Sequence, residues 1–354
     1  MRDVLYFNTW YRGHNNARYE ELLPRLERVD AKLLTFPRPR LVRAAAERAW
    51  RAVRPGVEPR ILRTLERRHP YAFVTDVPQL ASLGVPAVVD VDDPAFTPEH
   101  AALLNRAAAY VVTAERAARR YEELGVRTPW HVVPQGVTRT PHTERLRRTR
   151  PTVGYLAAFH LLPGDRGGDN PLYDVSHLLE LWDEIAARMP GARLELIGLA
   201  SRAVRERVRG RGDVAVTGRV PRAELLRRVA AWDVALYPRT EDQGIRASKI
   251  AEYLGAGVPI VSYDYEVVAD VRETGAGLLV RTPREFIGAV ERLLRNPEER
   301  GRLAGAARAA GAERDWDVLA MRYAAILDQH LPRTEGRPDS REPRGGDPAT
   351  PSVH

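Results

Sequence analysis

The stretch RASKIAEYLGAGVPIV, residues 246–261, predicts the fold of the half of the chain in which it lies. Its pattern is that of a short helix, residues 249–256, which ends at Gly257 before Pro259 and leads directly into an apolar strand. The stretch also holds one of only two lysines among 55 basic residues, the other being Lys32. Because arginine is used everywhere else, Lys249 indicates a position with its own chemical requirement.

On both sides of this stretch, short apolar runs rich in β-branched residues alternate with segments of helical periodicity. This pattern is typical of parallel sheets with helical crossovers. The predicted helices of the first half span 18–28, 58–68, 99–107 and 115–124. The predicted strands are 3–7, 32–36, 71–75, 87–91, 110–113, 131–134, 152–159, 193–198, 213–218, 233–238, 259–263 and 277–280.

The order of these elements predicts an α/β protein of two Rossmann-like domains, residues 1–147 and 148–311, joined by a polar, basic linker over 140–151. Open parallel sheets bind ligands at the carboxyl ends of their strands, so we expect both sheets to face a central cleft. Residues 312–331 read as a last helix that packs back on the first domain. The tail 332–354 is poor in apolar residues, and we expect it to be disordered.

Composition narrows the class of protein. With 354 residues and 44% hydrophobic content, the chain is long enough for two cores. A net charge of +8 favours anionic partners, but no zinc finger or RNP-like motif indicates nucleic acid. The absence of cysteine excludes disulfides and thiolate metal sites. No apolar run is long enough to cross a bilayer and no signal peptide is recognisable, so we expect a cytoplasmic protein; the arginine bias favours a high-GC bacterial source.

One segment of the first half is unusually rich in arginine. Residues 40–54 read as a helix with an apolar stripe and arginines spread around it. It is either an ordinary docked helix with a solvated rim or a peripheral contact with an anionic membrane.

The spacing of Lys249 and Glu252 indicates an anion site. Three residues apart on a helix, they share one face, and the N–H groups of residues 246–249, Ser248 included, open at the helix N-terminus. A diphosphate there meets the helix dipole and an ammonium, and the carboxylate one turn further in can accept the hydroxyls of a ribose. The alternative is a surface ion pair worth about 0.3 kcal/mol.

The segment AAWDVALYPRTEDQGIRASKIAEYLGAGVPIVSYDYEVVADVRETGAGLLV resembles the nucleotide-sugar-binding signature of GT-B glycosyltransferases, particularly the retaining family 4 (group 1). HVVPQGV resembles the family's strand at the end of the first domain, and DVAVTGRVPRAELLRRVAAWDVALYP resembles its base-binding region. The resemblance implies that Glu252 contacts the ribose and that the turn from Gly244 through Arg246 and Ser248 to Lys249 receives the diphosphate of a UDP-, GDP- or dTDP-sugar.

The sequence departs from the family pattern at two places. Many members carry a second glutamate where this chain has Gly244, and we expect Glu241 or Asp242 to reach the donor sugar instead. The glycine-rich turn after the first strand of the second domain lacks the usual lysine, and Arg166 is the candidate for the second cation.

Two loops of the first domain are candidates for the acceptor side. Gly13, His14 and Asn15, with Asn16, form a turn that opens a helix; Asn16 can equally be an N-cap. The matching loop of GT-B enzymes touches donor phosphates or acceptor, which makes His14 a candidate catalytic residue. VVDVDDP places Asp90, Asp92 and Asp93 at a strand end; we interpret Asp93 as part of an acceptor-hydroxyl site or the start of a turn, not as a metal ligand.

The predicted function is a metal-independent, retaining transfer of a sugar from a nucleoside diphosphate sugar to an acceptor hydroxyl, without a further cofactor. Three alternatives remain at this point: a sugar-nucleotide 2-epimerase of the same fold, a non-catalytic nucleotide- or glycan-binding protein, and a nicotinamide-dependent dehydrogenase. The last is least favoured because no G-x-G-x-x-G follows the first strand of either half. Base, sugar, acceptor and oligomeric state stay open.

Overall fold

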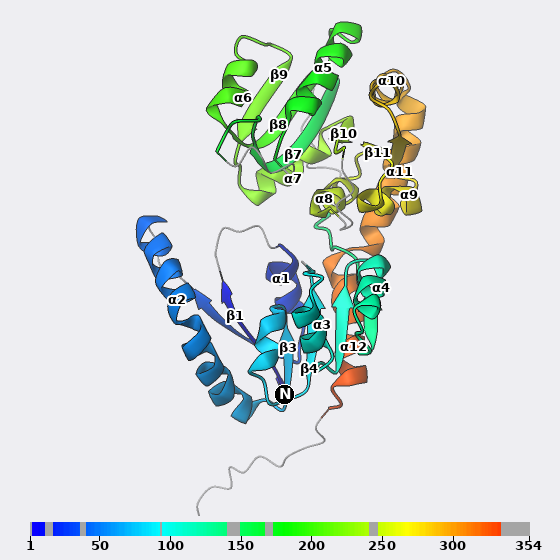
Figure 1. Cartoon of the computed structure of the whole chain (residues 1–354). Helices are drawn as coiled ribbons and strands as arrows, with labels where there is room; N and C mark the ends of the chain where they lie inside the picture. The colour runs from blue at the N-terminus through cyan, green and yellow to red at the C-terminus, as the bar shows by residue number, and fades with distance from the viewer. Residues whose placement is uncertain are drawn as a thin grey trace, which may run out of the picture.

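The computed structural model describes residues 2–10, 17–35, 40–92, 94–139, 149–166, 173–240 and 247–333. These residues form two lobes, each built on a six-stranded sheet with helices around it (Figure 1). The strand pairs are parallel in both sheets. The predicted α/β fold of two Rossmann-like domains is confirmed, and each of the twelve predicted strands overlaps a strand of the structure.

The N-terminal sheet has the strand order β2-β1-β3-β4-β5-β6. The chain runs from β1 to β2 and then returns to the other side of β1, so the direction of winding reverses between β1 and β3. Such a reversal opens a crevice at the carboxyl ends of the two strands. The strands are β1 (Val4–Trp10), β2 (Val29–Thr35), β3 (Tyr71–Val74), β4 (Ala87–Val91), β5 (Ala109–Val112) and β6 (Trp130–Val132).

The C-terminal sheet has the order β12-β11-β10-β7-β8-β9, which is the Rossmann order 3-2-1-4-5-6 read from β9. Its reversal lies between β7 and β10. The strands are β7 (Thr152–His160), β8 (Arg193–Ala200), β9 (Val214–Gly218), β10 (Val234–Tyr237), β11 (Ile260–Tyr263) and β12 (Gly277–Val280).

Period-two alternation divides each strand between two cores. In β1, Val4 and Tyr6 enter the core on one face of the sheet, whereas Leu5 and Phe7 enter the core on the other. Helices cover both faces, because a parallel sheet is apolar on both. They are α1 (Ala17–Leu22), α2 (Arg40–Leu65), α3 (Pro98–Leu104), α4 (Glu115–Glu123), α5 (Ser176–Arg188), α6 (Arg202–Arg207), α7 (Arg222–Ala230), α8 (Ser248–Ala256), α9 (Ala269–Thr274), α10 (Pro283–Arg295), α11 (Pro297–Glu313) and α12 (Trp316–His330).

The last helix returns to the first lobe. Only Arg314 and Asp315 separate α11, on the C-terminal lobe, from α12, which runs along the N-terminal one (Figure 1). Leu319 and Tyr323 of α12 are completely buried in the same core as Val4 and Phe73. The N-terminal core therefore includes residues from both ends of the described chain.

Two helices differ from the prediction, both at proline. The helix expected over 18–28 ends at Leu22 and continues as a 3-10 turn, η1 (Leu23–Arg25), so that β2 begins at Val29. Pro24 has no N–H to continue the α-helical ladder. In contrast, α2 runs unbroken through Pro55 and Pro59, where we expected a boundary. Arg51 and Pro55, whose carbonyls lose their partners there, are exposed to water.

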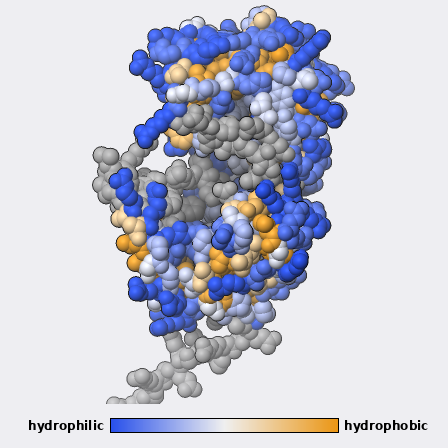
Figure 2. All heavy atoms as spheres, viewed as in Figure 1, coloured by the Kyte–Doolittle hydropathy of each residue, from blue (hydrophilic) through white to orange (hydrophobic). Residues whose placement is uncertain are grey.

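The remaining 3-10 turns are η2 (Glu66–Arg68), η3 (Val77–Ala81) and η5 (Glu266–Val268). Hydrophilic side chains cover most of the face seen in Figure 2, with apolar residues in small groups between them. Among the described helices, none has the length and apolarity needed to span a bilayer.

Candidate functional site

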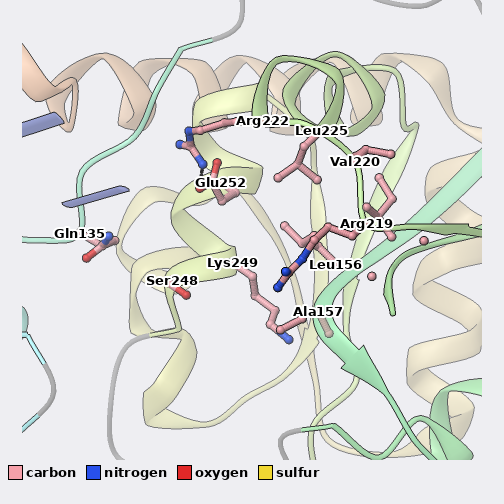
Figure 3. Close-up of a pocket in the computed structure, with 14 residues that line it drawn as sticks. Gln135, Leu156, Ala157, Arg219, Val220, Arg222, Leu225, Ser248, Lys249 and Glu252 are labelled. Atoms are coloured by element: carbon pink, nitrogen blue, oxygen red, sulfur yellow. Dashed lines mark hydrogen bonds and ion pairs between the residues drawn. The ribbon is translucent and has the colours of Figure 1, made fainter. Parts of the chain in front are cut away.

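A cavity of about 210 Å³ lies where the two lobes meet, beside the reversal point of the C-terminal sheet. Its walls come from the ends of β7 and β8, the turn after β9, and the first turns of α7 and α8 (Figure 3). Gln135, from the segment after β6, is the contribution of the N-terminal lobe. The site predicted at helix 249–256 is therefore part of an interdomain cavity.

Helix α8 presents its N-terminus to this cavity. It begins at Ser248, which is exposed and lines the wall, and it ends at Gly257, whose φ of 66° is the left-handed C-terminal cap that glycine adopts readily. Ala247, at the N-cap, has no side chain that can accept a hydrogen bond from the first turn. Among the described residues, nothing accepts a hydrogen bond from the N–H groups of Ser248 and Lys249, which can therefore receive an anion.

Lys249 is held by aromatic side chains. Its Nζ donates a hydrogen bond to Tyr155 Oη at 3.1 Å and lies 4.5 Å from the centroid of the Tyr155 ring and 5.5 Å from that of Tyr237. Burial lowers the pKa of Lys249, and the neighbouring charge of Arg239 lowers it further. A poorly hydrated ammonium in this position gains more from a bound anion than an exposed one does.

Glu252 has a partner from another helix. Its Oε1 accepts a hydrogen bond from Arg222 Nη1 at 3.0 Å, and Arg222 Nη2 donates to Thr138 Oγ1 at 3.1 Å. Lys249 and Glu252 thus have separate partners, Tyr155 and Arg222, and the simple surface ion pair between them is not what the structure contains. Both side chains line the cavity (Figure 3).

Besides Lys249 and the paired Arg222, the cavity wall contains a further cation, Arg219. It follows Gly218, which has a φ of 76°, and its side chain extends toward Lys249 (Figure 3). Arg166, the predicted second cation, is exposed in the turn after β7 and is not among the residues that line the cavity. Sequence reasoning placed Arg219 and Arg222 within a base-binding block without singling either out.

Seven of the predicted site residues lie outside the described residues. They are Gly13, His14, Asn15, Asp93, Glu241, Gly244 and Arg246. The same holds for Asn16 and Asp242. Their roles stay predictions.

Asp90, one of the aspartates predicted at the end of β4, lies in the interior of the N-terminal lobe. Asp90 is fully buried and forms a two-pronged ion pair with the fully buried Arg18, at 2.9 and 3.1 Å. Arg18 also donates to the carbonyl of Pro134 and to Gln135 Oε1, so it fixes the segment that reaches the cavity. Asp90 is therefore a structural residue. Among the described residues, no group of three potential ligands has the arrangement of a metal site.

A buried histidine lies behind the cavity. His160, the last residue of β7, is fully buried, and burial lowers its pKa to about 4, with a smaller contribution from the charge of Lys249. Gly198, in the cavity wall, has a φ of 145°, and a Cβ there would lie 1.9 Å from the Ala157 carbonyl oxygen and 2.9 Å from His160 Nε2. Only glycine fits between the strand and this ring.

Comparisons with known proteins find similarity to glycosyltransferases. Residues 169–296 match the profile of the family described as Glycosyl transferases group 1. Glycosyltransferase 1 domain-containing protein 1 of Xenopus tropicalis is 24% identical over 211 residues, which cover 56% of this chain and 59% of that protein. The matched region thus spans less than two thirds of that relative.

Solved structures give the same result for the fold. HepE of Anabaena in complex with UDP has a TM-score of 0.66 at 15% identity, covering 92% of this chain and 100% of that one. WaaG, a glycosyltransferase involved in lipopolysaccharide biosynthesis, has a TM-score of 0.59 at 14% identity, covering 92% and 99%. The predicted GT-B fold and the predicted resemblance to the group 1 glycosyltransferases are confirmed.

Proposed function

We propose that this chain, a GT-B protein whose residues 169–296 match the group 1 glycosyl transferases, is a glycosyltransferase that moves a sugar from a nucleoside diphosphate sugar to an acceptor hydroxyl. The observation that carries the proposal is the first turn of α8. There the half-buried ammonium of Lys249 and the carboxylate of Glu252 line one interdomain cavity, one helical turn apart.

The donor can be placed group by group. HepE has been solved with UDP and with UDP-glucose, and for this chain we propose a donor of the same class. The diphosphate lies at the N-terminus of α8, beside Lys249 and Arg219, where positive side chains and the N–H groups of the first helical turn lie together. The ribose lies on Glu252, and the base lies against the apolar wall that Val220 and Leu225 form.

The proposed transfer depends on stabilising the negative charge that develops on the leaving diphosphate. As the bond between the sugar C1 and the phosphate oxygen breaks, the leaving diphosphate gains negative charge, which Lys249, held in place by Tyr155, and Arg219 stabilise. The acceptor oxygen forms the new bond to C1 on the face that the diphosphate leaves, and its proton passes to a phosphate oxygen. Configuration is then retained, and the cations take the part that a metal ion takes in other enzymes.

A single set of incubations tests this function. Purified protein is mixed with UDP- and GDP-sugars, with and without acceptor hydroxyl compounds, and the products are separated by chromatography. Glycosyl transfer that requires an acceptor supports the proposal. Conversion of the donor to its 2-epimer without acceptor establishes the epimerase instead, and donor binding without any turnover establishes a binding protein; either result overturns the proposal.

We further propose that α2 contacts an anionic membrane surface. Arg48, Arg51 and Arg60 are exposed on this helix, and the side chains of Val53 and Val57 are 50% and 37% exposed near them. Trp50 of the predicted apolar stripe is buried, but the two exposed valines among these cations suit an interface of anionic headgroups. Vesicles with anionic lipid should carry the protein in a flotation assay and neutral vesicles should not; equal flotation on both, or on neither, rejects the contact. Bacterial source and cytoplasmic location stay predictions.

A further inference from the structure

The ion pair between Arg222 and Glu252 is incompletely satisfied. Glu252 Oε1 and the two terminal nitrogens of Arg222 have partners, but Glu252 Oε2 and Arg222 Nε are buried and have none among the described residues. One of these atoms is an acceptor and the other is a donor. A buried polar atom without a partner is costly, and because both residues line the cavity, a ligand bound there can supply both missing hydrogen bonds.

The two atoms call for a ligand that donates and accepts. A hydroxyl group does both, whereas a phosphate oxygen only accepts and an ammonium only donates. Two adjacent hydroxyls can serve both atoms together, one donating to Glu252 Oε2 and the other accepting from Arg222 Nε. The ribose diol of a ribonucleotide is such a group, and the cavity wall holds both residues one helical turn from the proposed diphosphate site.

The fold itself holds the Arg222 side chain in position. It is the first residue of α7, directly after Pro221, and its second terminal nitrogen is held by Thr138 of the N-terminal lobe. Glu252 lies inside α8, with 19% of its side chain exposed. Two rigid helices and the interdomain segment therefore fix the pair before a ligand binds.

We propose that Arg222 is a specificity-determining residue, which together with Glu252 reads both hydroxyls of the donor's ribose and so selects ribonucleoside over 2′-deoxyribonucleoside diphosphate sugars. This inference rests on the proposed function, and it narrows the donor to the UDP- and GDP-sugars at the expense of the dTDP-sugars. Loss of the 2′-hydroxyl leaves a buried polar atom unpaired, which should weaken binding about tenfold or more.

Calorimetric titration of the full chain with two nucleotide pairs tests the selection. The pairs are UDP with 2′-deoxy-UDP, and GDP with 2′-deoxy-GDP; the measured quantity is the ratio of Kd for the deoxy form to Kd for the ribo form. We expect a ratio of about ten or more for the better-binding base. If neither UDP nor GDP binds but dTDP does, the inference fails and the proposed function stands; if none of the three binds, the proposed function fails as well. If a base binds with a ratio near one, only the inference fails.

Variants assign the selection to Arg222. In Arg222→Met the ratio should fall to near one, because we assign the 2′-hydroxyl to Arg222 Nε and the 3′-hydroxyl, which the ribo and deoxy forms both carry, to Glu252 Oε2. Arg222→Lys keeps a cation for Glu252 but lacks the Nε–H, so it should fold normally and still lose most of the ratio. Arg219→Met is the matched control: it should weaken both forms of a nucleotide and leave their ratio unchanged. A full ratio in folded Arg222→Lys, or a lost ratio in Arg219→Met, overturns the assignment.

Discussion

At the scale of single residues, Lys249 is the position with the clearest catalytic consequence. Its ammonium lies in the cavity against Tyr155, with Arg219 as the neighbouring cation in the wall. Lys249→Ala should lower turnover at saturating donor by about 10² or more, the scale for loss of one charge-stabilising group. Lys32→Ala is the control, because the only other lysine is exposed and paired with Asp30 on β2. Unchanged turnover in Lys249→Ala would exclude this role.

His160 gives a pH dependence of stability. Its pKa in the folded protein is about 4, below its ordinary value of 6.5. The unfolded chain therefore binds the proton first, and the free energy of unfolding should fall as the pH drops from about 6.5 to about 4, by about 3 kcal/mol in all. Chemical denaturation across this range measures the slope. His160→Gln should make the slope shallower, although burial also lowers the pKa of His131 and His330, whereas His177→Gln, which alters a partly exposed histidine, should leave the slope unchanged.

The site residues that the sequence predicted are close to each other in the chain, whereas those that it missed interact with residues far away in the chain. Lys249 and Glu252 were found because three residues on one helix give a readable spacing. The Arg222–Glu252 pair joins residues 30 apart on different helices, and no pattern in the sequence states that contact. Asp90 was read only as one of three carboxylates at the end of a strand, since the ion pair that it forms is with Arg18, 72 residues away.

At the scale of elements, α8 is held close to its neighbours by glycine. A Cβ on Gly255 would lie 2.9 Å from the Cβ of Val137, whose N–H is bound to the Arg314 carbonyl. Gly255→Ala should therefore lower the free energy of unfolding by about 1–3 kcal/mol, as overpacking does, and raise KM for the donor because α8 must move. Gly288→Ala in α10, where a Cβ meets nothing within 4 Å, should be neutral or stabilising. Thermal unfolding compares the two, and equal stability of both variants contradicts the close packing.

The elements themselves were predictable because parallel strands are short apolar runs and crossover helices are long and periodic. The positions at which helices end near a proline could not be predicted from the sequence. Pro24 ended α1 early, but Pro55 and Pro59 did not end α2, since the carbonyls they leave unpaired are on the water-exposed side. A proline shows that one hydrogen bond is missing, and only the tertiary surroundings decide whether water replaces it.

At the scale of the whole molecule, α12 ties the end of the described chain to the cavity through a buried relay. Tyr323 packs edge-on against Phe73 and accepts a hydrogen bond from Arg18, which in turn holds Asp90 and Gln135. Gln135 is the part of the N-terminal lobe that lines the cavity. The sequence predicted that this helix packs back on the first domain but did not identify the relay.

Tyr323→Ala should therefore have two effects. Removing a buried aromatic ring should lower the free energy of unfolding by about 3–5 kcal/mol, measured by denaturant titration. Loss of its hydroxyl also removes one of the partners that hold Arg18 in place, so donor affinity should fall in the protein that remains folded. Tyr323→Phe separates these effects, because it keeps the ring and removes only the hydroxyl: it should retain most of the stability and still weaken donor binding. Met321→Ala, on the same helix with its side chain 66% exposed, should change neither quantity. If Tyr323→Phe binds donor as the wild type does, the core contact of α12 stabilises the lobe without positioning the cavity.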